Sequence, residues 1–150
     1  MVVRVQAQDF DVGAEYRGLT AGDRSIGAVV SFVGLVRDLA DGSDVTAMTL
    51  EHYPGMTEKQ LLAIEAEAHQ RWPLNKTLIV HRFGRLQPAD QIVLVITSSA
   101  HRQAAFDACN FLMDWLKTQA PFWKMEETPA GTRWVDAKLP DIQAAQRWSR

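Results

Sequence analysis

The chain has 150 residues, of which 47% are hydrophobic and 23% are charged, and its formal net charge is −2. This length suits a single domain over residues 1–150, and the weakly acidic balance excludes a general affinity for nucleic acid or anionic membranes. No apolar run approaches the roughly 18 residues that a membrane span needs, and the first residues do not resemble a signal peptide.

The first third of the chain predicts three strands. Residues 2–7 indicate a short strand, and residues 9–19 fit a short helix less clearly. Residues 26–37 are apolar and β-branched, which is typical of a buried strand. Residues 38–44 are small and polar and predict a mobile loop. Residues 45–53 alternate between polar and apolar, so we expect a strand that forms a hairpin with the preceding one.

The middle of the chain predicts a helix followed by two strands. Thr57, with Gln60 three residues later, is typical of a capping box. Apolar residues then recur at helical spacing until Pro73, which ends the helix. Residues 76–86 and 91–98 predict two strands joined by a tight turn.

A second helix follows these strands. Ser98 and Ser99 offer an N-cap. The apolar side of the helix collects six residues at helical spacing, namely Ala105, Phe106, Cys109, Leu112, Met113 and Leu116.

The last segment of the chain predicts two short strands and a tail. Pro121 cannot extend the second helix, and residues 122–128 and 133–136 then indicate strands. Residues 136–150 form a polar tail with a helical pattern and Trp148 as its anchor. Because hairpins alternate with two main helices, we expect an α+β fold with antiparallel or mixed sheets, and not a doubly wound parallel sheet.

The motifs of several enzyme classes are absent from the sequence. There is no GxxxxGK[ST], GxGxxG, HExxH, paired CxxC or GxSxG. The histidines lack metal-ligand spacing, so we expect neither a metal nor a cofactor. Cys109 is the only cysteine, which excludes an intrachain disulfide, fits a reducing cytoplasm and favours a buried structural thiol. The residues interpreted as structural or core are His52, His69, His81, Trp115, Phe122 and Trp123.

Cations gather at the ends of the predicted elements. His101 and Arg102 begin a helix, where free backbone N–H groups and the helix dipole favour a phosphate or another anion. Arg37 ends a buried strand at the start of a loop, a common position for a functional arginine. The alternative for all three is that the side chain simply points into solvent.

Two lysines flank Pro121. On one continuous helix Lys117 and Lys124 would lie roughly 10 Å apart along the axis. Pro121 turns the chain instead, so the two lysines can converge from a helix end and a strand, where Phe122, Lys124 and Glu126 share a face. A helix-capping Lys117 and a solvated Lys124 are the alternative. If the lysines, Arg37, His101 and Arg102 all face one cleft, the site suits a small anion.

Four segments resemble a known family. They are GAVVSFVGLVRD around Arg37, LEHYPGMTEKQL at 50–61, SAHRQAAF at 99–106 and DWLKTQAPFWK at 114–124. Over residues 8–138 the sequence resembles the large, catalytic subunit of molybdopterin synthase. The resemblance implies an α/β-hammerhead type of fold. It also implies a sulfurtransferase of molybdenum cofactor biosynthesis that acts on cyclic pyranopterin monophosphate and forms the dithiolene of molybdopterin.

The resemblance further implies partners and site residues. The sulfur donor would be the C-terminal Gly-Gly thiocarboxylate of a small ubiquitin-like subunit, and the catalytic subunit would be a homodimer within a heterotetramer. Lys117 and Lys124 would be catalytic. The substrate contacts would be Leu35, Val36, Arg37, His101, Arg102, Lys117, Lys124, Met125 and Glu126.

Two other functions are compatible with the same cations. A phosphoesterase or acyl-transfer enzyme would act on a phosphorylated metabolite without any protein partner. A non-catalytic module would bind a ubiquitin-like protein and form no pterin product.

Overall fold

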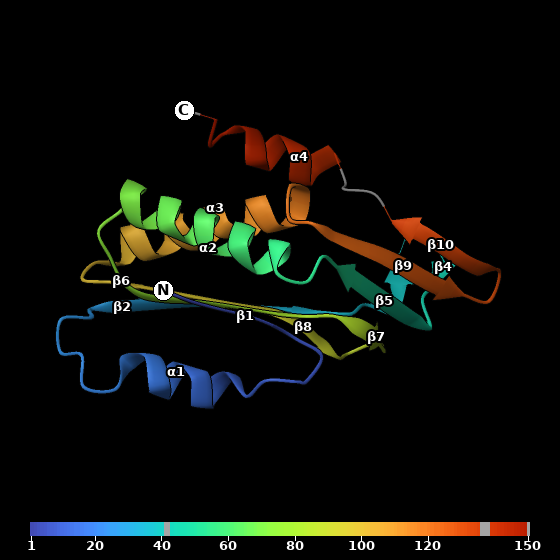
Figure 1. Cartoon of the computed structure of the whole chain (residues 1–150), viewed down its shortest axis with the longest axis horizontal. Coiled ribbons are helices and arrows are strands. Elements are labelled where there is room, and N and C mark those ends of the chain that lie inside the picture. Colours follow the sequence, from blue (N-terminus) through green and yellow to red (C-terminus); the bar gives the residue numbers. More distant parts are fainter. Residues whose placement is uncertain (41–42, 136–138, 150) are drawn as a thin grey trace.

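A computed structural model of the chain describes residues 1–40, 43–135 and 139–149 (Figure 1). In these residues the helices are α1 (Val12–Thr20), α2 (Met56–Arg71), α3 (Arg102–Thr118) and α4 (Leu139–Gln146). The strands are β1 (Val2–Gln6), β2 (Ala28–Leu35), β3 (Leu39–Ala40), β4 (Ser43–Asp44), β5 (Ala47–His52), β6 (Leu74–Arg82), β7 (Gly84–Leu86), β8 (Gln91–Ser99), β9 (Phe122–Thr128) and β10 (Gly131–Val135). No helix in the described part of the chain is long and apolar enough to cross a membrane.

The first sheet lies between two layers of helices. Its strand order is β1-β6-β8-β2, with β1 parallel to β6 and the other neighbours antiparallel. Helix α1 covers one face, and α2 and α3 cover the other (Figure 1). Because both faces are covered, β8 is buried and apolar from Ile92 to Ile96. Val93 and Val95 pack towards α2 and α3, whereas Leu94 and Ile96 pack towards α1.

The second sheet has the order β10-β9-β5-β7 and is antiparallel throughout. The chain passes from the first sheet to the second between β6 and β7, where Phe83 separates the two strands and Gly84 begins β7. Gly84 has a φ of 94°, a conformation that favours glycine because it has no Cβ. One mixed and one antiparallel sheet confirm the predicted α+β class.

The predicted hairpin between residues 26–37 and 45–53 is wrong. β2 pairs with β8, whereas β5 pairs with β7 and β9. Residues 38–44, predicted to be a mobile loop, contain the strands β3 and β4 paired with each other, while residues 41–42 lie outside the described residues. Alternation along a strand indicates which face is buried, but it carries no information about the partner strand.

The cap of α2 differs from the predicted one. The helix begins after Gly55, whose φ is 84°, and the Glu58 carboxylate accepts a hydrogen bond from the Gly55 N–H. Thr57, the predicted cap, lies within the helix, and its hydroxyl accepts a hydrogen bond from the Tyr53 N–H at 3.1 Å. Only one half of a capping box therefore occurs, the bond to the N3 glutamate, and the N-cap is a glycine two residues earlier in the chain than Thr57.

The start of α3 also differs from the prediction. Ser98 and Ser99 are the last residues of β8, and their hydroxyls donate to backbone carbonyls at 2.6 and 2.8 Å. His101 is the N-cap, with no hydrogen bond from its side chain to the helix. Phe106, predicted on the apolar side, is 53% exposed.

The C-terminal segment forms a helix anchored by Trp148, as predicted. The Trp148 ring packs edge-on against Trp72 and Phe111, with centroids 5.5 and 5.6 Å apart. Its indole N–H and the Arg147 guanidinium both donate to the Asp114 carboxylate, at 2.6 and 2.7 Å. This segment therefore covers α3, although residues 136–138 between it and β10 lie outside the described residues.

Candidate active site

The two lysines line one cavity. Lys117 lies in the last turn of α3, and Lys124 follows on β9 after the turn that contains Pro121. Both side chains border a cavity of about 590 Å³ whose walls come from β2, β6, β8, α3, α4 and the second sheet. The chain reversal at Pro121 thus places the lysines together, as its position in the sequence indicates.

The end of β2 contributes one cation to the cavity. Arg37 and Leu35 both line it, and the Leu35 side chain is 52% exposed. Val36, predicted as a substrate contact, is instead buried in the core. Its N–H donates to the Asp90 carbonyl at 2.9 Å, and its carbonyl accepts from the Ala89 N–H at 2.8 Å. Val36 therefore holds the strand end in place while its neighbours face the cavity.

Strand β9 contributes four residues to the cavity. Phe122, Trp123, Lys124 and Glu126 line it, whereas Met125 is absent from the lining. Glu126 is buried, and its carboxylate accepts two hydrogen bonds from the Arg133 guanidinium, at 2.9 and 3.2 Å. Because this pair is neutral overall, Glu126 does not cancel the charge of the lysines.

His101 and Arg102 are not part of this cavity. They lie at the N-terminal end of α3, and Lys117 lies at its C-terminal end. Arg102 and Lys117 are 15 positions apart on one helix, which amounts to about 22 Å along the axis. Both side chains are exposed. The expectation that all five cations face one cleft is therefore wrong within a single chain.

His81 lines the cavity although its position in a strand favoured a structural role. It is buried at the end of β6, and its ring stacks on Phe122 with centroids 3.7 Å apart and an interplanar angle of 16°. Burial, and after it the charges of Lys124 and Lys117, lower the pKa of His81 to about 3, against the effect of its hydrogen bond to the Arg82 carbonyl. Local pattern gives no sign of this role, because it depends on contacts between two sheets.

The aromatic residues near Pro121 differ in their surroundings. Trp115 packs against the core, as predicted. Phe122 and Trp123, predicted to be core residues, line the cavity instead. Trp123 is exposed at its rim, where Tyr53 packs edge-on against it at 4.4 Å. These rings give the cavity an apolar wall beside its cations.

Cys109 is not suited to act as a nucleophile. Its thiol is buried in the main core cluster, and burial raises its pKa to about 11. The prediction of a buried structural thiol is confirmed.

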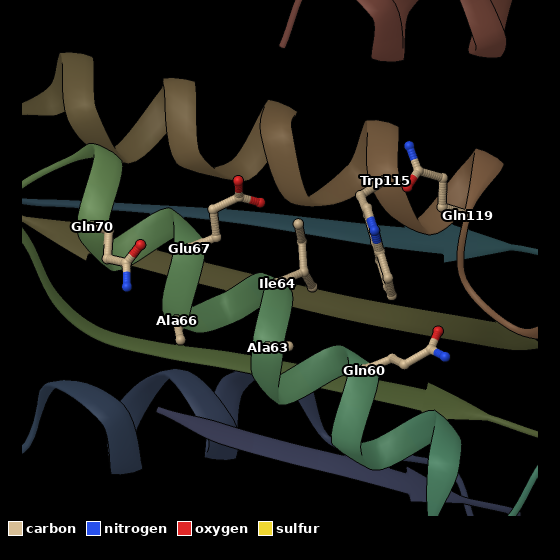
Figure 2. Close-up of a pocket in the computed structure, with 8 residues that line it drawn as sticks. All are labelled: Gln60, Ala63, Ile64, Ala66, Glu67, Gln70, Trp115 and Gln119. Carbon is tan, nitrogen blue, oxygen red and sulfur yellow. The ribbon is translucent and has the colours of Figure 1, made fainter. Parts of the chain in front are cut away.

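Two grooves run along α2. In the first, Trp115 of α3 points towards the α2 side chains around Ile64, and Gln119, the residue after α3, also borders the groove (Figure 2). The second lies between α2, α3 and α4 and shares Ile64, Glu67, Trp115 and Gln119 with the first. Their charged side chains, Glu67 and Arg71, pair with each other at 3.4 Å. Because this pair has no net charge, an anion is attracted less to either groove than to the cavity of Lys117 and Lys124.

Comparisons with known proteins agree with one another. The model of the MoaE protein family matches residues 5–119. A molybdopterin synthase catalytic subunit of Pseudomonas aeruginosa is 61% identical over 148 residues, which is 99% of each chain. The solved structure of a molybdopterin biosynthesis MoaE protein from Burkholderia ambifaria superposes with a TM-score of 0.84 at 56% identity, covering 99% of this chain and 98% of that one.

A more distant structure preserves the same fold. Molybdopterin synthase from Staphylococcus aureus, at 35% identity, superposes with a TM-score of 0.81 over 88% of this chain and 95% of that one. The family match covers well over half of the chain, and the relatives match it almost from end to end. This chain belongs to the MoaE protein family.

Proposed function

We propose that this chain is the catalytic subunit of a molybdopterin synthase. It transfers sulfur from the C-terminal thiocarboxylate of a small ubiquitin-like carrier to cyclic pyranopterin monophosphate, and so forms the dithiolene of molybdopterin. The observation that carries the proposal is the cavity in which Arg37, Lys117 and Lys124 meet. Relatives named for this activity favour it over a partner-independent phosphoesterase and over a non-catalytic binder.

The cavity matches the chemistry of the two substrates. Lys117, at the helix end, acts closest to the thiocarboxylate carbonyl and the reacting carbon, as general acid or base. Lys124 stabilises the negative charge that develops on the leaving oxygen. Arg37 holds the phosphate by charge-assisted hydrogen bonds. The rings of Phe122 and Trp123 form the apolar wall against which the planar pterin packs.

The carrier must reach this cavity with an extended tail. A Gly-Gly end has no side chains, so it can enter a narrow slot and be held mainly through backbone hydrogen bonds. Leu35, Trp123 and Trp134 line the cavity and are exposed at its edge, and Trp134 is 63% exposed. These residues form the apolar rim that the body of the carrier covers. We expect the enzyme to work in the cytoplasm.

A second copy of the chain completes the site. His101 and Arg102 cannot reach the substrate from their own α3, about 22 Å from Lys117. On α3, Arg102, Phe106, Asn110 and Lys117 fall on one exposed stripe. In a two-fold dimer that packs these stripes antiparallel, the N-terminal end of one α3 meets the C-terminal end of the other. The homodimer within the heterotetramer thereby brings His101 and Arg102 to the partner's cavity.

Lysine variants test the proposed roles. The protein is incubated with thiocarboxylated carrier and cyclic pyranopterin monophosphate, and dithiolene product is measured. Lys117→Ala and Lys124→Ala are each expected to lower the rate by on the order of 10²–10³, the usual effect of removing a well-placed electrostatic group. Lys59→Ala, an exposed lysine on α2, is the matched control and should retain full activity. Near-full activity of both cavity variants would contradict the assignment, and turnover without the carrier would favour the phosphoesterase.

A further inference from the structure

His81 is the buried titratable side chain of the cavity that the proposed chemistry leaves without a role. Ile79, two residues earlier on β6, belongs to the core cluster formed with α2 and α3. Because side chains two residues apart share a face of a strand, His81 lies on this face of the first sheet as well. Its exposed fraction is 6%, and what remains uncovered borders the cavity of Lys117 and Lys124.

Two contacts fix the orientation of the ring. The Phe122 ring stacks on one face of the imidazole at 3.7 Å, and Nδ1 lies 2.8 Å from the Arg82 carbonyl oxygen. A carbonyl can only accept a hydrogen bond, so Nδ1 must carry the proton and donate it. In the neutral ring Nε2 is then the acceptor, with its lone pair directed away from Arg82.

The neutral form persists at every pH at which the enzyme is expected to work. Burial and the neighbouring cations oppose protonation strongly enough that the pKa of His81 falls to about 3. Lys124 from β9, Lys117 from α3 and His52 from β5 each lower the pKa of His81, while Arg37, Glu126 and Asp141 also line the same cavity. A further positive charge beside the two lysines is therefore excluded at this position.

The fixed neutral ring is an oriented dipole. Its positive end, the Nδ1–H, is held by the Arg82 carbonyl, and its negative end, Nε2, is on the opposite side. Phe122 and Lys124 share a face of β9 and are two residues apart, so the lysine is the next neighbour of the stacked pair along the strand. A neutral acceptor beside an ammonium group favours the charged form of the lysine without competing for the substrate anion.

We propose that His81 is a positioning residue for sulfur transfer, whose neutral Nε2 accepts a hydrogen bond from the Lys124 ammonium group and holds it towards the developing negative charge. The stack on Phe122 keeps the strand that carries Lys124 against the ring. The expected effect on turnover rests on the proposed function. The hydrogen bond to Lys124 does not, because it would also be present in the free protein.

Two substitutions of His81 distinguish the role of Nε2 as a hydrogen-bond acceptor from the packing of the ring on Phe122. His81→Phe retains a ring that can stack on Phe122 but removes the acceptor, whereas His81→Gln places an amide oxygen near the position of Nε2. We expect kcat to fall about tenfold to a hundredfold in His81→Phe with little change in KM, because a charge-assisted hydrogen bond is lost. His81→Gln should retain most of the activity. Equal losses in both variants would indicate packing alone and would overturn the proposal.

A measurement on the free protein does not depend on turnover. Nuclear magnetic resonance of the lysine side chains should show that Lys124 loses its proton at a lower pH in His81→Phe than in the unsubstituted protein or in His81→Gln. The ring nitrogens of His81 should show the neutral Nδ1-protonated form from about pH 5 to pH 8. An unchanged Lys124 titration, or a ring that protonates in this range, would overturn the proposal. Failure of the unsubstituted protein to form dithiolene would count against the proposed function and leave this result intact.

Discussion

At the residue scale, Glu65 is a carboxyl whose burial opposes folding. It is completely buried on α2, and Oε1 has no hydrogen-bond partner within the described residues. Thr77 donates its hydroxyl hydrogen to the other oxygen at 2.8 Å, so Thr77 must accept its bond from His69 Nε2, also at 2.8 Å. His69, interpreted from sequence as a structural residue, is thus the outer member of this series of hydrogen bonds. Burial raises the pKa of Glu65 to about 7.

This raised pKa predicts a pH-dependent stability. Below about pH 4.5 the carboxyl is protonated in both the folded and the unfolded chain, and it has no effect. Between about pH 4.5 and 7 the unfolded chain releases a proton that the folded chain keeps, so the free energy of unfolding decreases as the pH rises. Glu65→Gln removes this loss and should stabilise the fold above pH 7 by up to roughly 3 kcal/mol.

Urea unfolding as a function of pH measures this effect. The stability gained by Glu65→Gln should be small near pH 4.5 and should grow until about pH 7. Glu67→Gln, on the same helix but partly exposed, is the matched control and should show no such growth. A gain that does not change with pH would mean that the carboxyl is not protonated in the folded chain.

At the scale of elements, hydropathy patterns predicted β8, α3 and β9 to within a few residues, because each is long and strongly patterned. The predicted strand 76–86 is instead divided into β6 and β7, which belong to different sheets. The division occurs at Gly84, where the left-handed conformation turns the chain away from the first sheet. That turn brings β7 to the edge of the second sheet, beside β5, which pairs in turn with the strand that carries Lys124.

Gly84→Ala tests the importance of this conformation. A Cβ at Gly84 would meet open space, so the substitution acts only through backbone strain. We expect a loss of roughly 1–2 kcal/mol of stability, measured by thermal or urea unfolding. Gly18→Ala is the matched control, since its Cβ also meets open space but its residue is helical, and it should gain roughly 0.5–1 kcal/mol. Equal effects at the two positions would be inconsistent with strain at Gly84.

At the scale of the whole molecule, α3 places His101 and Arg102 at one end and Lys117 at the other. Its 17 residues keep Arg102 away from Lys117, so the five predicted cations can meet only across two chains. Phe106 on α3 and Phe32 on the edge strand β2 are exposed large apolar side chains, and α3 packs against β2. Burying such a surface between two copies would favour the dimer.

Mixing two variants tests whether the site is shared. Arg102→Ala and Lys117→Ala each damage both sites of their own homodimer. In a mixed dimer one site carries both substitutions, and the other site has an intact Lys117 and an intact Arg102. Random mixing makes half of the dimers mixed, so co-refolding equal amounts should restore about a quarter of the unsubstituted activity. A mixture no more active than its parents would mean that each site uses a single chain.

The sequence alone determined the main helices and the longer strands, which family the chain resembles, and that Pro121 lets two lysines converge. These features are local, since they depend on residue types a few positions apart. Only the tertiary structure decided the partners of β2 and β5 and the place of His81 beneath Phe122. Both depend on contacts between segments far apart in the chain, and periodicity along a single segment does not encode such contacts.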